Sequence, residues 1–186
     1  MNRYIFSHLP IAFIYGLLIA LVRGNWLPFE LSEIVRWVLF AVGVVIGVLI
    51  LFLDRVVYTY SYPEEQLSQQ FAWFAKNKKW MSGLVLLDAR RDEQNKLTFR
   101  SALFMAVWVP LALFSVTSTS SLFGKGVVMG LMFHILMDAW RMQKSNPARL
   151  NERIFWQIAR PVRREEQVVF LTVVTAVFVW FSFWVA

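Results

Sequence analysis

The chain has 186 residues, 58% of them hydrophobic, and a mean hydropathy of +0.53, which indicates an integral membrane protein and excludes an ordinary soluble domain. It contains no cysteine, and this excludes a disulfide framework, a thiol nucleophile and a thiolate metal site. The net charge of +7 is typical of cytoplasmic loops that face anionic lipid, so we expect membrane lipids, and no nucleic acid, as partners.

Five apolar segments predict an all-α, multi-pass transmembrane bundle that forms one integral membrane domain over residues 1–186. The first follows Arg3 without a small-residue cleavage site, so we interpret it as an uncleaved span. The fourth is the shortest, and a re-entrant segment is the alternative to a full span there. The predicted spans cover residues 5–22, 37–53, 99–116, 126–140 and 168–186.

Residues 67–87, between the second and third spans, predict an amphipathic helix on the cytoplasmic leaflet. Leu67, Phe71 and Phe74 follow helical spacing, and nearby lysines and tryptophans suit a membrane surface. This helix would be either a surface anchor or a lid over a substrate site. The lysines are Lys76, Lys78 and Lys79, and the tryptophans are Trp73 and Trp80.

The distribution of positive charge predicts the orientation. With five spans, sixteen of the nineteen Lys and Arg residues lie on one side, and only Arg23, Arg36 and Lys125 lie on the other. The positive-inside rule then places the N-terminus and both long loops in the cytoplasm and the C-terminus outside an inner (plasma) membrane.

Small residues predict the packing faces of the spans. Gly43 and Gly47 form a Gly-x-x-x-Gly pair in the second span, a common helix-packing motif. In the third span Ala102, Ala106 and Pro110 share one face, which we expect to point into the bundle.

His134 and Asp138 are an ionisable pair inside the fourth predicted span. An aspartate near a helix centre costs roughly 2.5 kcal/mol or more to insert, so such residues are candidates for function. Their spacing of four places them on one helical face, and the same face carries Gly126 and Gly130, which would admit a neighbouring helix.

Two further ionisable residues are predicted at the same depth as His134 and Asp138. His8 lies in the first span and Asp54 ends the second, both toward the cytoplasmic side. Two imidazoles and two carboxylates would form a first shell for one divalent zinc, manganese or iron ion. The alternative for each residue alone is a packing hydrogen bond or, for Asp54 beside Arg55, a solvated ion pair.

Four short segments resemble the motifs of the bacterial membrane-bound metal-dependent hydrolase family. Ser7-His8 resembles an early Thr-His, and the stretch from Gly130 through His134 to Asp138 resembles Gly-x-x-x-His-x-x-x-Asp. Asp54 keeps only the second aspartate of a Pro-Asp-x-Asp motif. Residues 98–101 stand where a His-Arg…Thr-His-Ser motif belongs and lack its histidines.

The resemblance implies hydrolysis of a phosphate ester or lipid headgroup at the cytoplasmic face. The metal ligands would be His8, Asp54, His134 and Asp138, with metal-bound water as the nucleophile and Arg100 or Arg141 steadying the phosphate.

The missing motif residues would remove a second metal or the general base, so the sequence leaves open whether the protein is an enzyme. The alternative is a non-catalytic subunit or scaffold that packs against lipids and partner helices in a larger membrane complex or homo-oligomer. The sequence contains no internal repeat, which disfavours a transporter.

Overall fold

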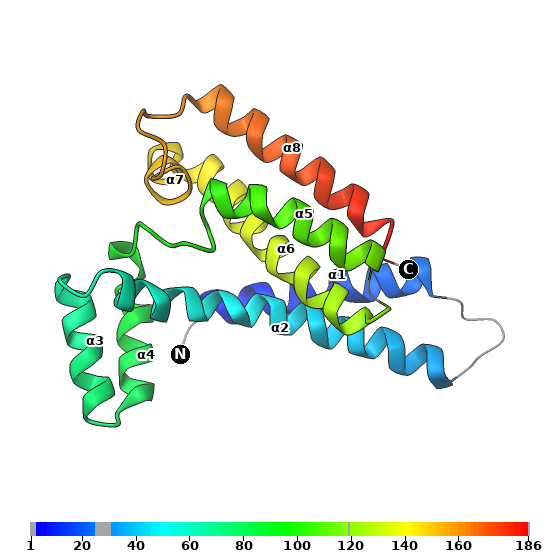
Figure 1. Ribbon diagram of the computed structural model, residues 1–186, viewed down its shortest axis with the longest axis horizontal. Coiled ribbons are helices and arrows are strands. Elements are labelled where there is room, and N and C mark those ends of the chain that lie inside the picture. The colour runs from blue at the N-terminus through cyan, green and yellow to red at the C-terminus, as the bar shows by residue number, and fades with distance from the viewer. Residues whose placement is uncertain (1–2, 25–30, 119, 186) are drawn as a thin grey trace.

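The computed structural model describes residues 3–24, 31–118 and 120–185, with the backbone alone for residues 3–9. All regular secondary structure in these ranges is helical, which confirms the all-α fold class (Figure 1). The helices are α1 (Arg3–Arg23), α2 (Leu31–Ser61), α3 (Gln66–Lys76), α4 (Trp80–Ala89), α5 (Ala102–Ser118), α6 (Leu122–Ser145), α7 (Pro147–Ile154) and α8 (Arg164–Ser182), with a 3₁₀ turn, η1, at Arg91–Glu93.

Among the described residues, three helices are long and apolar enough to cross a membrane: α2, α6 and α8. The Pro10–Arg23 part of α1 and all of α5 are apolar but shorter, so a membrane location is supported while the number of five spans stays a prediction. The fourth predicted span is one continuous helix of 24 residues, α6, which is longer than the expected 126–140. This length removes the reason for considering a re-entrant segment there.

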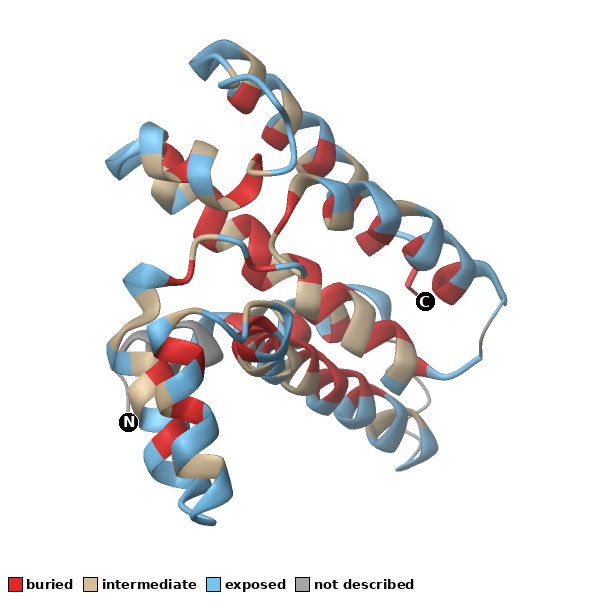
Figure 2. Cartoon of the chain, turned by 60° about the vertical axis from the view of Figure 1, so that its left-hand side comes forward, coloured by how far each residue is buried: buried red, intermediate tan, exposed pale blue. Residues whose placement is uncertain are grey.

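Large apolar side chains remain exposed on the outer faces of the long helices, whereas the buried residues face the middle of the bundle (Figure 2). Leu18 on α1, Phe114 on α5 and Val169 on α8 are each more than half exposed. Contiguous apolar surface of this kind is typical of helices whose outer faces contact lipid.

The closest helix contact in the bundle joins α2 and α6 through glycine. A Cβ atom added to Gly130 would overlap the backbone carbonyl oxygen of Val44, and one added to Gly47 would overlap that of Val127. Gly43 and Gly126 meet the opposite backbone in the same way. The predicted glycine faces of both helices are therefore confirmed, and each is the partner of the other.

Beyond these glycines, α2 and α6 diverge. Both helices run in the same direction, and in Figure 1 the N-terminal half of α6 crosses the middle of α2, after which the two helices separate toward the ends that carry α3 and α7. The result is a V whose apex is the glycine contact. Large residues that follow Gly47 and Gly130 can then line an opening between the two helices.

Hydrogen bonds attach the remaining long helices to α6, the helix in the middle of the bundle. The indole nitrogen of Trp108 on α5 donates to the carbonyl of Val128 at 2.9 Å, and that of Trp140 donates to Thr175 Oγ1 on α8 at 3.0 Å. At the other end of α6, Lys125 Nζ donates to the carbonyl of Val185 at 3.0 Å. Lipid tails offer no hydrogen-bond partners to these side chains, and the hydrophobic effect contributes little to helix association in a bilayer. Hydrogen bonds between helices therefore help to hold such a bundle together.

The predicted inward face of α5 is wrong. Ala106 and Pro110 are exposed, whereas Met105, Trp108 and Ala112 are buried. A buried indole N–H needs an acceptor, and that of Trp108 donates to the carbonyl of Val128 on α6. This hydrogen bond, and not the face of small residues, determines which side of α5 points inward.

The single interfacial helix predicted over residues 67–87 is also wrong, because the segment is a helical hairpin. The chain reverses between α3 and α4 at Lys78, which has a left-handed φ of 56°. Leu67 and Phe71 then bury against Leu87, and Gly83 leaves room for the Phe71 ring. Two antiparallel helices bury these apolar residues against each other, which one straight helix could not do.

We expect Gly130→Val to lower the stability of the protein in detergent by about 1–3 kcal/mol, because a branched side chain would meet the backbone of α2. The thermal midpoint of unfolding measures the change. Gly124→Ala is the matched control, since an added Cβ there meets only Ser121 at 3.7 Å. A Gly130→Val protein as stable as the Gly124→Ala protein would show that the α2–α6 contact is not as close as described.

Candidate anion-binding site

A pocket of about 190 Å³ lies between α2 and α6 where the two helices diverge. The α2 wall runs from Val48 to Arg55, starting one residue after the last glycine contact. The α6 wall runs from His134 to Ser145. The segment 91–100, which leads into α5, and helix α7 complete the lining.

Arginine dominates the lining of this pocket, which we call the arginine pocket. Six arginines and two aspartates line it, a surplus of four positive charges (six minus two). The aspartates are Asp92 and Asp138, and His134 is the remaining titratable residue. The arginines are Arg55, Arg91, Arg100, Arg141, Arg149 and Arg153, drawn from four separate parts of the chain.

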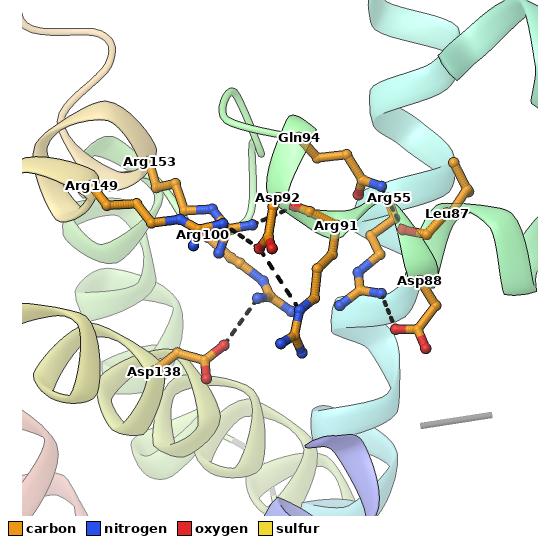
Figure 3. Close-up of polar contacts among 10 residues, drawn as sticks. All are labelled: Arg55, Leu87, Asp88, Arg91, Asp92, Gln94, Arg100, Asp138, Arg149 and Arg153. Carbon is orange, nitrogen blue, oxygen red and sulfur yellow. Dashed lines mark hydrogen bonds and ion pairs between the residues drawn. The ribbon is translucent and has the colours of Figure 1, made fainter. Parts of the chain in front are cut away.

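Arg100 and Asp138 form the ion pair at the centre of the pocket (Figure 3). Arg100 Nη1 donates to Asp138 Oδ2 at 2.9 Å, and both side chains are nearly buried. The Nε2 atom of His134 lies 3.5 Å from the same carboxylate oxygen. Asp138 therefore contacts an arginine and a histidine together, and its charge is already balanced by protein.

The wall formed by segment 91–100 is connected to α7 and to the α3–α4 hairpin. Arg149 donates to Asp92, and Arg153 Nη2 donates to the carbonyl of Arg91 at 2.6 Å. On the hairpin side, the buried Gln94 Nε2 donates to the carbonyl of Leu87 at 2.6 Å (Figure 3). These contacts keep several guanidinium groups close together despite their mutual repulsion.

Arg55 forms its own ion pair at the edge of the pocket. Its Nη1 lies 2.6 Å from Asp88 Oδ1, at the end of α4. The sequence alternative of a solvated pair between Arg55 and the adjacent Asp54 is therefore wrong, because Asp88 takes that position. This pair joins the hairpin to the end of α2.

Asp54 is fully buried and positions the segment that carries Arg100. Its Oδ1 accepts the backbone N–H of Phe99 at 3.1 Å, one residue before Arg100. It does not line the arginine pocket. This hydrogen bond holds the chain next to Arg100, so Asp54 helps to position Arg100 where it meets Asp138.

Burial and neighbouring charges shift the pKa values of two residues that line the pocket. Burial, and then the charges of Arg100 and Arg149, lower the pKa of Arg153 to about 10, so it stays protonated at neutral pH. Burial raises the pKa of Asp92, but the hydrogen bond and charge of Arg149 lower it more, and the group titrates below its usual range. The site therefore stays cationic across the neutral range.

Two buried arginine donors in the described part of the chain have no acceptor. They are the Nε atoms of Arg100 and Arg153. Leaving a buried donor unsatisfied costs about 1–3 kcal/mol, and more for a charged group. An anion with several acceptor oxygens, held beside these side chains, would remove that cost and offset the surplus charge.

The structure brings together only part of the predicted metal centre. His134 and Asp138 are adjacent, Asp54 lies outside the pocket, and the His8 side chain is outside the described residues. Among the residues whose side chains are described, no group of three or more His, Asp or Glu could hold a metal ion. Arg100 and Arg141, predicted to steady a phosphate, both line the pocket.

Four arginines of the pocket were missed by sequence reasoning. Arg91 lies in a polar loop and Arg55 lies next to Asp54, and neither position carries a spacing signal. Arg149 and Arg153 carry a usable signal, because a spacing of four places both on one face of a short helix whose Leu150 and Ile154 are buried. No sequence pattern indicates that this face meets segment 91–100.

The chain has no significant match among protein-family models, curated proteins or solved structures. The resemblance to the membrane-bound hydrolases therefore rests on the short motifs alone.

We expect the protein, purified without chelator, to contain no stoichiometric zinc, manganese or iron. Asp138 is occupied by Arg100, and an ion added beside that arginine would be repelled by it. Elemental analysis of the parent protein and of His134→Ala measures this. One ion per chain in the parent, lost in the variant, would instead establish the metal centre that the family resemblance implies.

Proposed function

We propose that this chain is a five-span inner-membrane protein that binds an anion of the phosphate class in the arginine pocket. The surplus of positive charge on the lining of this pocket, three charges once Arg55 is paired with Asp88, is the observation that carries the proposal. Arginine suits phosphate because its planar guanidinium donates two parallel hydrogen bonds and stays charged. The two unsatisfied Nε donors of Arg100 and Arg153 support the same ligand chemistry.

The proposal places the arginine pocket at the cytoplasmic end of the bundle. The pocket lies where α2 and α6 end and where both long connecting segments emerge, and those segments hold most of the Lys and Arg. The positive-inside rule favours the cytoplasm for that end.

Anion binding is favoured over the metal-dependent hydrolysis that the family resemblance implies. A hydrolytic metal centre needs several anionic or neutral ligands around one ion. The described pocket offers mainly cations, and its central carboxylate is paired with Arg100. The residues that resemble the hydrolase motif, Gly130, His134 and Asp138, have packing and charge-pairing roles in this arrangement.

Inorganic phosphate should raise the thermal midpoint of the detergent-solubilised protein, because a ligand that binds only the folded state stabilises it. The Arg141→Gln protein should need about tenfold more phosphate for the same rise in midpoint, since a hydrogen bond to a charged group contributes about 1.5–3 kcal/mol. Arg141 is exposed at the pocket edge, so the variant should fold.

Lys144→Gln is the matched control, because it removes one positive charge from the same turn region of α6 without touching the pocket. Sodium chloride at equal ionic strength controls for screening. A midpoint that rises no further with phosphate or with any phosphate ester than with sodium chloride would contradict anion binding and favour the scaffold alternative.

A cytoplasm-specific reporter fused after Ala186 should give no signal, while one inserted at Asn95, in the segment between α4 and α5, should give a strong signal. The reason is the sixteen-to-three division of Lys and Arg between the two sides. Signal from the C-terminal fusion would mean an even number of spans and would contradict the five-span topology.

A further inference from the structure

The arginine pocket has a polarity gradient along α2. Val48, Leu51 and Phe52 form its deeper part, and Arg55 forms the end nearest the helix terminus. The distance from Val48 to Arg55 is seven residues, about 10 Å of helical rise. The lining thus changes from apolar to cationic over about the thickness of the membrane layer in which acyl chains give way to headgroups.

The hairpin beside the pocket has a surface that suits a leaflet. Trp80, Met81, Leu84 and Val85 are exposed on one face of α4. The exposed lysines Lys76, Lys78 and Lys79 surround the turn before it. Apolar and aromatic residues next to lysine are typical of a segment that rests in the surface of an anionic membrane. In Figure 1, α4 lies on the side of the hairpin nearer the long helices, and α3 on the far side.

The same hairpin is joined directly to the pocket wall. Asp88 at the end of α4 pairs with Arg55 at 2.6 Å, and Leu87 accepts the hydrogen bond from Gln94 at 2.6 Å. Segment 91–100 then runs from α4 along the pocket to Arg100. An α4 helix held in the leaflet would therefore keep the cationic pocket level with the lipid phosphates.

Charge and volume narrow the class of phosphate. A phosphate monoester carries about −1.5 to −2 charges at neutral pH and presents three acceptor oxygens, whereas a diester carries one charge. Once Arg55 is paired with Asp88, five arginines remain against Asp92 and Asp138, and this surplus of three positive charges favours the monoester. The volume of about 190 Å³ is large enough for a phosphate group.

From these features we infer that the arginine pocket binds the terminal phosphate monoester of a membrane lipid, whose acyl chains stay in the surrounding leaflet. This inference rests on the proposed function and specifies its ligand. The phosphate oxygens accept from the guanidinium groups at the pocket edge, including Arg141 and Arg149. The glycerol end of the lipid passes the apolar part of the lining at Leu51 and Phe52.

The test compares four ligands on the full-length protein in a neutral detergent. They are dioctanoyl phosphatidic acid, dioctanoyl phosphatidylglycerol, glycerol 3-phosphate and inorganic phosphate. Phosphatidic acid and phosphatidylglycerol have the same chains but differ as monoester and diester, while glycerol 3-phosphate has the monoester without chains. Apparent affinity follows from the rise in thermal midpoint with ligand concentration.

We expect phosphatidic acid to bind at least tenfold more tightly than each of the other three ligands. Arg141→Gln should weaken phosphatidic acid binding by about tenfold, and Arg141→Glu by more, while Lys144→Gln should leave it unchanged.

Each alternative result overturns a defined part of the inference. Equal binding of glycerol 3-phosphate and phosphatidic acid would overturn the lipid source and point to a soluble phosphate ester. Equal binding of phosphatidylglycerol would overturn the choice of a monoester. Both results would leave the proposed anion binding intact, whereas no response to any of the four ligands would remove the proposed function itself.

Discussion

The backbone contact between α2 and α6 is the constraint on which the rest of the molecule depends. Four glycines allow the backbones of the two helices to touch. In a bilayer, helix association is driven by close packing rather than by the hydrophobic effect, so this contact stabilises the pair. The contact lies in the middle of α2 and in the N-terminal half of α6. Larger residues such as Phe52 and Met142 follow it, so the helices separate and the arginine pocket opens between them.

Gathering six arginines in one pocket is unfavourable in free energy, and contacts within the protein offset part of this unfavourable term. Burial, and then the charges of Arg100 and Arg149, lower the pKa of Arg153, so the cost includes both desolvation and repulsion between guanidinium groups. Asp92 and Asp138 offset part of the repulsion, and backbone carbonyls such as that of Arg91 accept from the rest. Asp54 contributes indirectly by holding the chain next to Arg100. A surplus of positive charge remains after these contacts, and surplus charge kept in an enclosed site is more often a feature of function than of stability.

The family resemblance and the structure give different roles to the same residues. The Gly130, His134 and Asp138 pattern suggests metal ligands because imidazole and carboxylate at that spacing share one helical face. Tertiary packing brings Arg100 to that face, and a guanidinium paired with Asp138 replaces the cation that a metal would supply. A lone helix cannot reveal this, since the partner comes from a segment 38 residues away.

The sequence by itself determined the helical class, the presence of apolar helices long enough to span a membrane, the glycine packing faces and the adjacency of His134 and Asp138. These follow from composition and from spacing within one helix, which local geometry fixes. It misplaced the hairpin and the rotation of α5, because a chain reversal at Lys78 and a bond from Trp108 to Val128 depend on partners distant in sequence. Only the tertiary structure decided that Arg55, Arg91, Arg149 and Arg153 meet Arg100 and Arg141. Each arginine alone resembles an ordinary surface charge, and the divergence of two helices beyond a glycine contact is what gathers them into one site.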